Sequence, residues 1–198
     1  AESAYVPVWM KKNSETYFRV ELYGGERLNT ISPLCTAAVE KDANAFSRLM
    51  EHIRETDENS AVIMVQVENE VGLLGTERDY CAQAEEVFGG SVPEMLLPEQ
   101  TEKERATWKE AFGDDAEEVF SAWCFASALE QIASAGREKH PLPCLTNVWL
   151  KQFPWYPGSY PSGGPVEDML WVWKAAAPSL FTIGPDIYVP YVSDIMKT

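Results

Sequence analysis

The sequence predicts an α/β fold in which helices alternate with the strands of a parallel sheet. Segments with helical periodicity alternate with short apolar runs rich in β-branched residues, in the order helix, strand, helix, strand, helix, strand. The chain of 198 residues is also long enough for one domain with a sizeable core. Such alternation is typical of right-handed strand–helix–strand units. Three strands would fit a small open sheet as well as part of a larger one.

The first elements follow an irregular, aromatic-rich region over residues 1–34. Between residues 36 and 56, apolar positions recur at alternating spacings of three and four, which predicts an amphipathic helix. Residues 61–67 are apolar and rich in β-branched side chains. Because this run is too short for a buried helix, it predicts a parallel strand over 62–67 that is covered on both faces.

The second half of the chain repeats the pattern after a loop-rich, acidic stretch over residues 72–113. Acidic residues in the first turn of the next helix and Gly136 at its expected C′ position agree with the preferences of helix ends. A loop rich in proline, glycine and aromatic residues spans 153–165. The remaining expected elements are a helix over about 115–135, a strand over 143–149, a helix over about 166–177 and a strand over 180–183 that runs into Gly184–Tyr188.

The composition is typical of a packed globular protein. Hydrophobic residues make up 45% of the chain and aromatic residues 12%, which argues against disorder. The net charge of −15 repels nucleic acid and anionic membrane surfaces, so neither is expected as a partner. No stretch reaches the roughly 18–20 apolar residues that a membrane helix needs.

The four cysteines are expected to be free and packed. Cys35, Cys81, Cys124 and Cys144 lie far apart and form no CxxC pair. Two of them fall in segments predicted as a buried helix and a buried strand, which favours free thiols over disulfides. This slightly favours a cytoplasmic location, with a secreted protein as the alternative.

A strand that ends in two acids is the most informative segment. The apolar run is followed by Glu68, Asn69 and Glu70, and a long loop begins at Gly72. In parallel α/β proteins the carboxyl ends of the strands carry the chemistry, because loops converge there. A carboxylic acid half out of water at such a rim tends to have a raised pKa, which suits a proton donor. A solvated strand end without chemistry explains the same residues about equally well.

Residues 66–70 followed by Gly72 resemble the strand-4 signature of glycoside hydrolase family 35, the β-galactosidase family. The resemblance implies a (β/α)8 TIM barrel, of which this chain would hold about strands 3/4 to 6, with residues 1–198 as part of a single catalytic domain. It also implies retaining hydrolysis of terminal β-D-galactosides by double displacement between two carboxylates. Weaker similarities are found at Tyr5–Trp9, which resembles the loop after strand 3, and at Asn147–Trp149, which resembles the end of strand 5. Tyr160–Pro165 and Gly184–Tyr188 resemble a bacterial branch of the family, at the strand 5 to 6 crossover and at strand 6.

The resemblance assigns roles position by position. Glu70 matches the general acid/base, and Asn69 matches the asparagine that contacts the sugar 2-hydroxyl beside the reacting carbon. Asn147, at the end of the strand-5 segment, is implied as a substrate contact, and Tyr188 is implied to orient the nucleophile. Strand geometry points Glu68 opposite to Asn69, so Glu68 is either a structural partner inside the barrel or a substrate contact.

The aromatic loop after the 143–149 strand adds a further candidate. Trp155, Tyr156 and Tyr160 could stack on the faces of sugar rings, which makes Trp155 a candidate substrate contact and places the loop beside the cleft of Glu70. Aromatic residues in proline-rich loops also commonly pack over a barrel rim, and this role is the alternative.

No residue of the chain matches the family's nucleophile, a glutamate on strand 7. Asp186 and Asp194 are the late acids near a strand end, and neither matches it. We therefore expect the chain alone to be inactive, with the remainder of the same barrel or an associated chain as its partner, because an open part of a barrel exposes strand edges and apolar faces. The alternative is a non-catalytic carbohydrate-binding or degenerate barrel relative that keeps Asn69 and Glu70.

Other chemistries lack a supporting pattern. His52 and His140 are isolated and have no metal-ligand spacing, so no metal site is expected. The GxSxG pattern of a nucleophilic serine is absent, and no glycine-rich phosphate loop precedes a helix. The implied reaction needs no cofactor.

Overall fold

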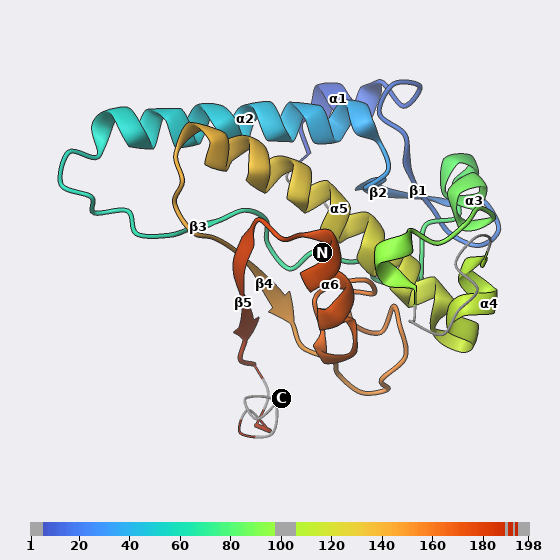
Figure 1. The fold of residues 1–198 in the computed structure, drawn as a ribbon. Helices are drawn as coiled ribbons and strands as arrows, with labels where there is room; N and C mark the ends of the chain where they lie inside the picture. Colours follow the sequence, from blue (N-terminus) through green and yellow to red (C-terminus); the bar gives the residue numbers. More distant parts are fainter. Residues whose placement is uncertain (1–5, 98–105, 189, 192, 194–198) are drawn as a thin grey trace.

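A computed structural model describes residues 6–97, 106–188, 190, 191 and 193 of the chain. These residues form two small sheets with helices packed beside them (Figure 1). An antiparallel pair consists of β1 (Arg19–Glu21) and β2 (Arg27–Ile31). A parallel sheet in the order β3-β4-β5 consists of β3 (Val65–Gln66), β4 (Cys144–Trp149) and β5 (Leu180–Asp186).

The predicted (β/α)8 TIM barrel, with this chain as its strands 3/4 to 6, is wrong for the described residues. Closure requires that every strand has two neighbours, with eight parallel strands around the barrel. Here β3 and β5 each pair with β4 alone, so the described sheet is open, and the remaining two strands form a separate antiparallel pair. The alternation of helices and strands therefore builds a three-stranded open sheet.

Two long helices pack against each other on one side of the molecule, α2 (Thr36–Thr56) and α5 (Ala116–Lys139). The bounds of α2 confirm the helix that the amphipathic pattern predicted. The helix α5 extends beyond its predicted end, so Gly136 lies inside it and not at a C′ position. A β-carbon at Gly136 would lie 2.3 Å from the ring of Phe46, and the missing side chain therefore lets the two helices approach closely.

One face of β4 joins the sheet to the helices. Cys144, Thr146 and Val148 alternate along the strand and are all buried, and the first and last of them belong to apolar clusters that include residues of α5. The helix α6 (Leu170–Ala176) also packs against α5 and follows the short 3-10 helix η3 (Glu167–Met169). All four cysteines are buried and free, as expected from their spacing.

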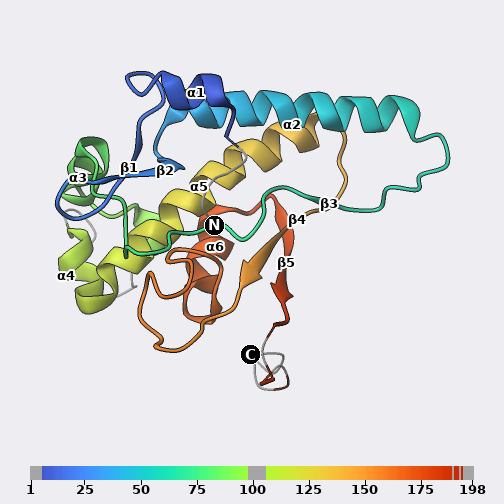
Figure 2. The ribbon, with the colours of Figure 1, turned by 180° about the vertical axis from the view of Figure 1, so that it is seen from behind.

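The parallel sheet lies below α2 in the view of Figure 1, and the carboxyl end of β5 points away from α2 in both ribbon views (Figure 2). The strand β5 is longer than predicted because residues 182–186 continue to pair with 145–149 of β4. The strand β3 is shorter than the predicted 62–67. The carboxylate of Asp57 accepts the N–H groups of Ala61 and Val62 at 2.9 and 2.8 Å, which holds this segment outside the ladder.

Several short helices occupy regions that were expected to be irregular. They are α1 (Val8–Lys12), α3 (Ala82–Phe88), the 3-10 helix η1 (Glu94–Leu96), α4 (Trp108–Phe112) and the 3-10 helix η2 (Gly113–Asp115). A capping box between Thr107 and Glu110 starts α4, whose first residue, Trp108, is fully buried. In the described parts of the chain, no helix has both the length and the apolar character needed to cross a membrane.

Candidate functional site

Three chain segments meet at the carboxyl rim of the parallel sheet. Residues 67–70 continue from β3, Asn147 lies in β4, and Asp186 is the last residue of β5. The pairing of Val67 N–H with the carbonyl of Leu145 at 2.8 Å brings the Glu68–Glu70 segment level with Asn147. The polar side chains of Asn69 and Asn147 and the turn at Glu70 therefore come together at one rim.

The side-chain amide of Asn147 connects these segments. Its Oδ1 accepts the backbone N–H of Glu70 at 2.8 Å and the Nε2–H of Gln66 at 3.2 Å. Its Nδ2 donates to Oδ2 of Asp186 at 2.6 Å and to Oδ1 of Asn69 at 3.1 Å. Asn147 is only 8% exposed, so loss of this side chain would leave several polar groups without their partner. We refer to these five residues as the Asn147 cluster.

The backbone at Glu70 has an unusual conformation. Its φ is +48°, in the left-handed region that a residue with a side chain seldom adopts, and it costs roughly 1–2 kcal/mol. The hydrogen bond from Glu70 N–H to Asn147 holds this conformation. Two residues later Gly72 has a φ of +136°, and a β-carbon there would lie 2.6 Å from Cβ of Pro161. The turn that carries Glu70 therefore has a defined shape set by its neighbours.

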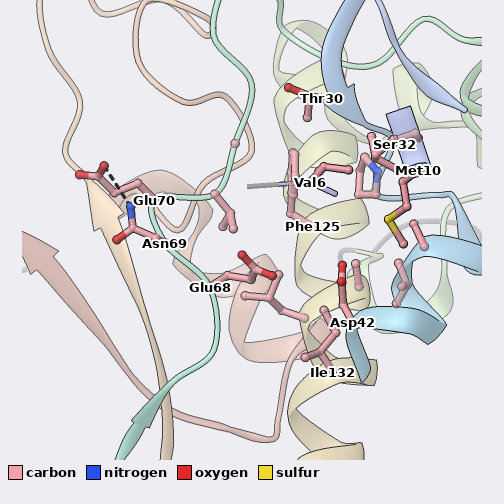
Figure 3. Close-up of a pocket in the computed structure, with 18 of the residues that line it drawn as sticks. Val6, Met10, Thr30, Ser32, Asp42, Glu68, Asn69, Glu70, Phe125 and Ile132 are labelled. Carbon is pink, nitrogen blue, oxygen red and sulfur yellow. Dashed lines mark hydrogen bonds between the residues drawn. The ribbon is translucent and has the colours of Figure 1, made fainter. Parts of the chain in front are cut away.

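The environment of Glu70 favours its protonated form. Partial burial raises the pKa of Glu70, and a hydrogen bond to Asp186 and the negative charge of Asp186 raise it further. The amide of Asn69 acts in the opposite direction by donating to Oε2 of Glu70 at 3.5 Å (Figure 3). A carboxyl group that keeps its proton is what general acid catalysis requires.

Asp186 is a member of the site to which the sequence assigned no role. Its carboxyl group lies within hydrogen-bonding range of that of Glu70. The two carboxyl groups of a retaining glycosidase are separated by about 5–5.5 Å, which leaves room for the reacting sugar carbon. Asp186 is too close to Glu70 to serve as the second carboxylate of such a pair.

Glu68 points in a different direction from the Asn147 cluster. It faces Asp42 of α2 across a cavity of about 240 Å³, which is lined largely by apolar side chains of α2, α5 and the N-terminal segment (Figure 3). Burial raises the pKa of Glu68 to about 7, with a further contribution from the negative charge of Asp42. Of the two roles left open for Glu68, this position supports the structural one.

The aromatic candidates have mixed outcomes. Trp155 is 51% exposed, has a φ of +71°, and lies with its ring centroid 6.0 Å from that of Tyr191. Tyr156 is exposed, but Tyr160 is buried and donates its hydroxyl to the carboxylate of Glu118 at 2.8 Å, so Tyr160 is a packing residue. Tyr188 is 73% exposed and lies two residues after the end of β5.

Two further residues of the sequence predictions, Tyr5 and Asp194, lie outside the described residues. Trp9, in the segment compared with the loop after strand 3, lies on α1 and packs its ring against Tyr17. Within the described ranges, no group of three or more histidine, cysteine, aspartate or glutamate side chains could hold a metal ion.

A comparison of the chain with models of protein families finds no match, and a comparison with curated proteins finds none either. The resemblance to glycoside hydrolase family 35 is therefore carried by the residues of the chain alone.

Proposed function

We propose that this chain carries the acid/base half of the active site of a retaining, β-galactosidase-like glycoside hydrolase. The observation that carries the proposal is the position of Glu70. Its carboxyl group stands at the carboxyl rim of a parallel sheet, its backbone is held by Asn147, and its raised pKa favours the protonated form. The motif around Glu70 resembles that of a family in which the same residue is the acid/base.

In the proposed reaction Glu70 acts twice. It first donates its proton to the glycosidic oxygen, whose bond to the sugar carbon breaks while a second carboxylate attacks that carbon. The resulting Glu70 carboxylate then takes a proton from a water molecule, which hydrolyses the covalent intermediate. Asn69 would hold the sugar 2-hydroxyl, because its exposed side chain keeps donor capacity beyond the long contact with Glu70.

The second carboxylate is proposed to come from further protein, either more of the same polypeptide or an associated chain. The described sheet supports this, because β3 and β5 each leave one edge unpaired among the described residues. Large apolar side chains lie exposed beside these edges, Ile63 at 79% and Phe181 at 70%.

A second candidate function is carbohydrate binding without catalysis. It is favoured by the pairing of Glu70 with Asp186, because Asp186 is the acid that the described residues place beside Glu70 and it matches no nucleophile of the family. Both functions predict that galactosides bind beside Asn69 and Glu70. They differ in turnover by the natural, complete protein.

The test compares Glu70→Gln with wild type in the complete protein, on a β-galactoside with a poor, alkyl leaving group. Glutamine is nearly isosteric but cannot donate the proton, so the rate should fall by about 10²–10⁴-fold. Glu58→Gln, an exposed position with the same change of charge, is the control and should keep the wild-type rate. A Glu70→Gln protein that hydrolyses this substrate at the wild-type rate would remove Glu70 from the mechanism. Galactoside binding without turnover by wild type would favour the binding function.

A further inference from the structure

Two carboxyl groups from neighbouring segments are held together by one amide. Asn147 accepts the backbone N–H of Glu70 through Oδ1 and donates to Oδ2 of Asp186 through Nδ2, at 2.8 and 2.6 Å. Because Asn147 is buried in the middle strand, both acids are fixed relative to the same rigid element. The amides also link the two carboxyl groups, because Asn147 donates to Asp186 and to Asn69, and Asn69 donates to Oε2 of Glu70.

The hydrogen bonds around the pair indicate which acid holds the proton. Two carboxyl groups in contact do not readily ionise together, so one proton is retained between them. Nδ2 of Asn147 donates to Oδ2 of Asp186 at 2.6 Å. Asn69 donates to Oε2 of Glu70 at the longer distance of 3.5 Å, and the pKa of Glu70 is raised. The proton is therefore held mainly by Glu70.

We propose that Asp186 is a positioning residue for the reaction proposed above. Its carboxylate accepts a hydrogen bond from the protonated Glu70 and keeps the proton there until a glycosidic oxygen accepts it. In that step the O–H bond of Glu70 breaks, a new O–H bond forms on the leaving alcohol, and Asp186 stays charged throughout. Glu68 and Asp42, the other acids near this turn, face the cavity between the helices.

The first test is a direct titration of carboxyl groups in the chain by NMR, with ¹³C-labelled aspartate and glutamate. Asp186→Asn removes a neighbouring negative charge, so Glu70 should lose its proton about one pH unit lower than in wild type. Asp114→Asn, at an exposed position in η2, makes the same change of charge elsewhere and should leave the Glu70 titration unchanged. In wild type, the Asp186 signal should also show an inflection at the pH where Glu70 titrates. Independent titration of the two signals in wild type, which needs no variant, would overturn the proposal.

The second test is the pH profile of kcat/KM for the complete protein. The basic limb reports loss of the Glu70 proton, so Asp186→Asn should move this limb to lower pH by about one unit, whereas Asp186→Glu, which keeps the charge, should move it less. A purely structural role would lower kcat/KM at every pH without moving the limb, and that result contradicts the proposal. If Asp186→Asn lowers the pH at which Glu70 titrates, but the complete wild-type protein hydrolyses no galactoside, the pairing is supported and the proposed function is refuted. The two ideas can therefore fail separately.

Discussion

Oδ1 of Asn147 accepts the backbone N–H of Glu70 at 2.8 Å, so a side chain of the central strand holds the backbone of the turn that follows β3. The same amide contacts Asn69, Gln66 and Asp186. The candidate acid is thus placed by a contact between segments that are 77 residues apart in sequence.

Replacement of Asn147 by alanine should destabilise the chain. The variant leaves the N–H of Glu70 and the carboxylate of Asp186 without this partner, which is expected to lower the free energy of unfolding by about 1–3 kcal/mol. Urea denaturation measures the difference. Asn59→Ala, at an exposed position in the turn after α2, is the control and should change little. Equal free energies of unfolding for the Asn147 variant and wild type would show that the hydrogen bonds of the Asn147 cluster do not stabilise the chain.

Gly72→Ala should destabilise the chain more than Gly75→Ala. Both glycines have positive φ, +136° and +80°, so alanine is strained at either position. A β-carbon at Gly72 would also lie 2.6 Å from Cβ of Pro161, whereas nothing lies within 4 Å of one at Gly75. Both variants place alanine at a positive φ, and only Gly72→Ala adds the collision with Pro161. Similar midpoints of thermal unfolding for both would contradict the close packing of the turn.

The stability of the chain should depend on pH through Glu68. Its pKa is raised from an ordinary value of 4.5 to about 7, so the folded state binds a proton that the unfolded state has already released between these values. The contribution of Glu68 to stability is therefore present below about pH 4.5 and is lost as the pH rises to about 7, to an extent on the order of 2–3 kcal/mol.

The Glu68→Gln variant isolates this effect, because its amide stays neutral at every pH. Urea unfolding should show a variant that gains stability over wild type between pH 5 and pH 8, while Glu58→Gln shows no such trend. Asp42, which faces Glu68 and has a pKa raised by burial, titrates in the same cavity, so the double variant with Asp42→Asn should be flatter still. A constant difference between Glu68→Gln and wild type at both pH values would refute this assignment.

Local sequence patterns predicted the individual helices and strands better than they predicted whether the sheet closes into a barrel. The spacing of apolar residues such as Val39, Phe46 and Met50 predicted a helix from residue 36 to about residue 56, and α2 agrees with it, because an amphipathic helix has a local periodic signal. The start of β3 is later than predicted, and the preceding segment is held by Asp57, whose carboxylate accepts the N–H groups of Ala61 and Val62. The barrel prediction rested on resemblance, whereas closure depends on strand pairs far apart in sequence.

The site was predictable in the same partial way. The order of residues in the motif pointed to Asn69 and Glu70, and the end of a predicted strand pointed to Asn147. The contact of Asp186 with Glu70 joins residues 116 positions apart and has no local signature. Gly136 shows the same limit. The local pattern predicted that it ends the helix, but it lies inside α5 and packs against the ring of Phe46.

The most direct test of the central claim is azide rescue of Glu70→Gln in the complete protein, with an activated aryl β-galactoside as substrate. This leaving group needs little protonation, so the covalent intermediate should form and accumulate, because the glutamine cannot deprotonate water. Azide needs no general base and should restore turnover, with β-galactosyl azide, the product of retained configuration, identified by NMR. An α-configured azide product, or a Gln variant with wild-type hydrolysis that azide does not change, would contradict the assignment of Glu70 as the acid/base.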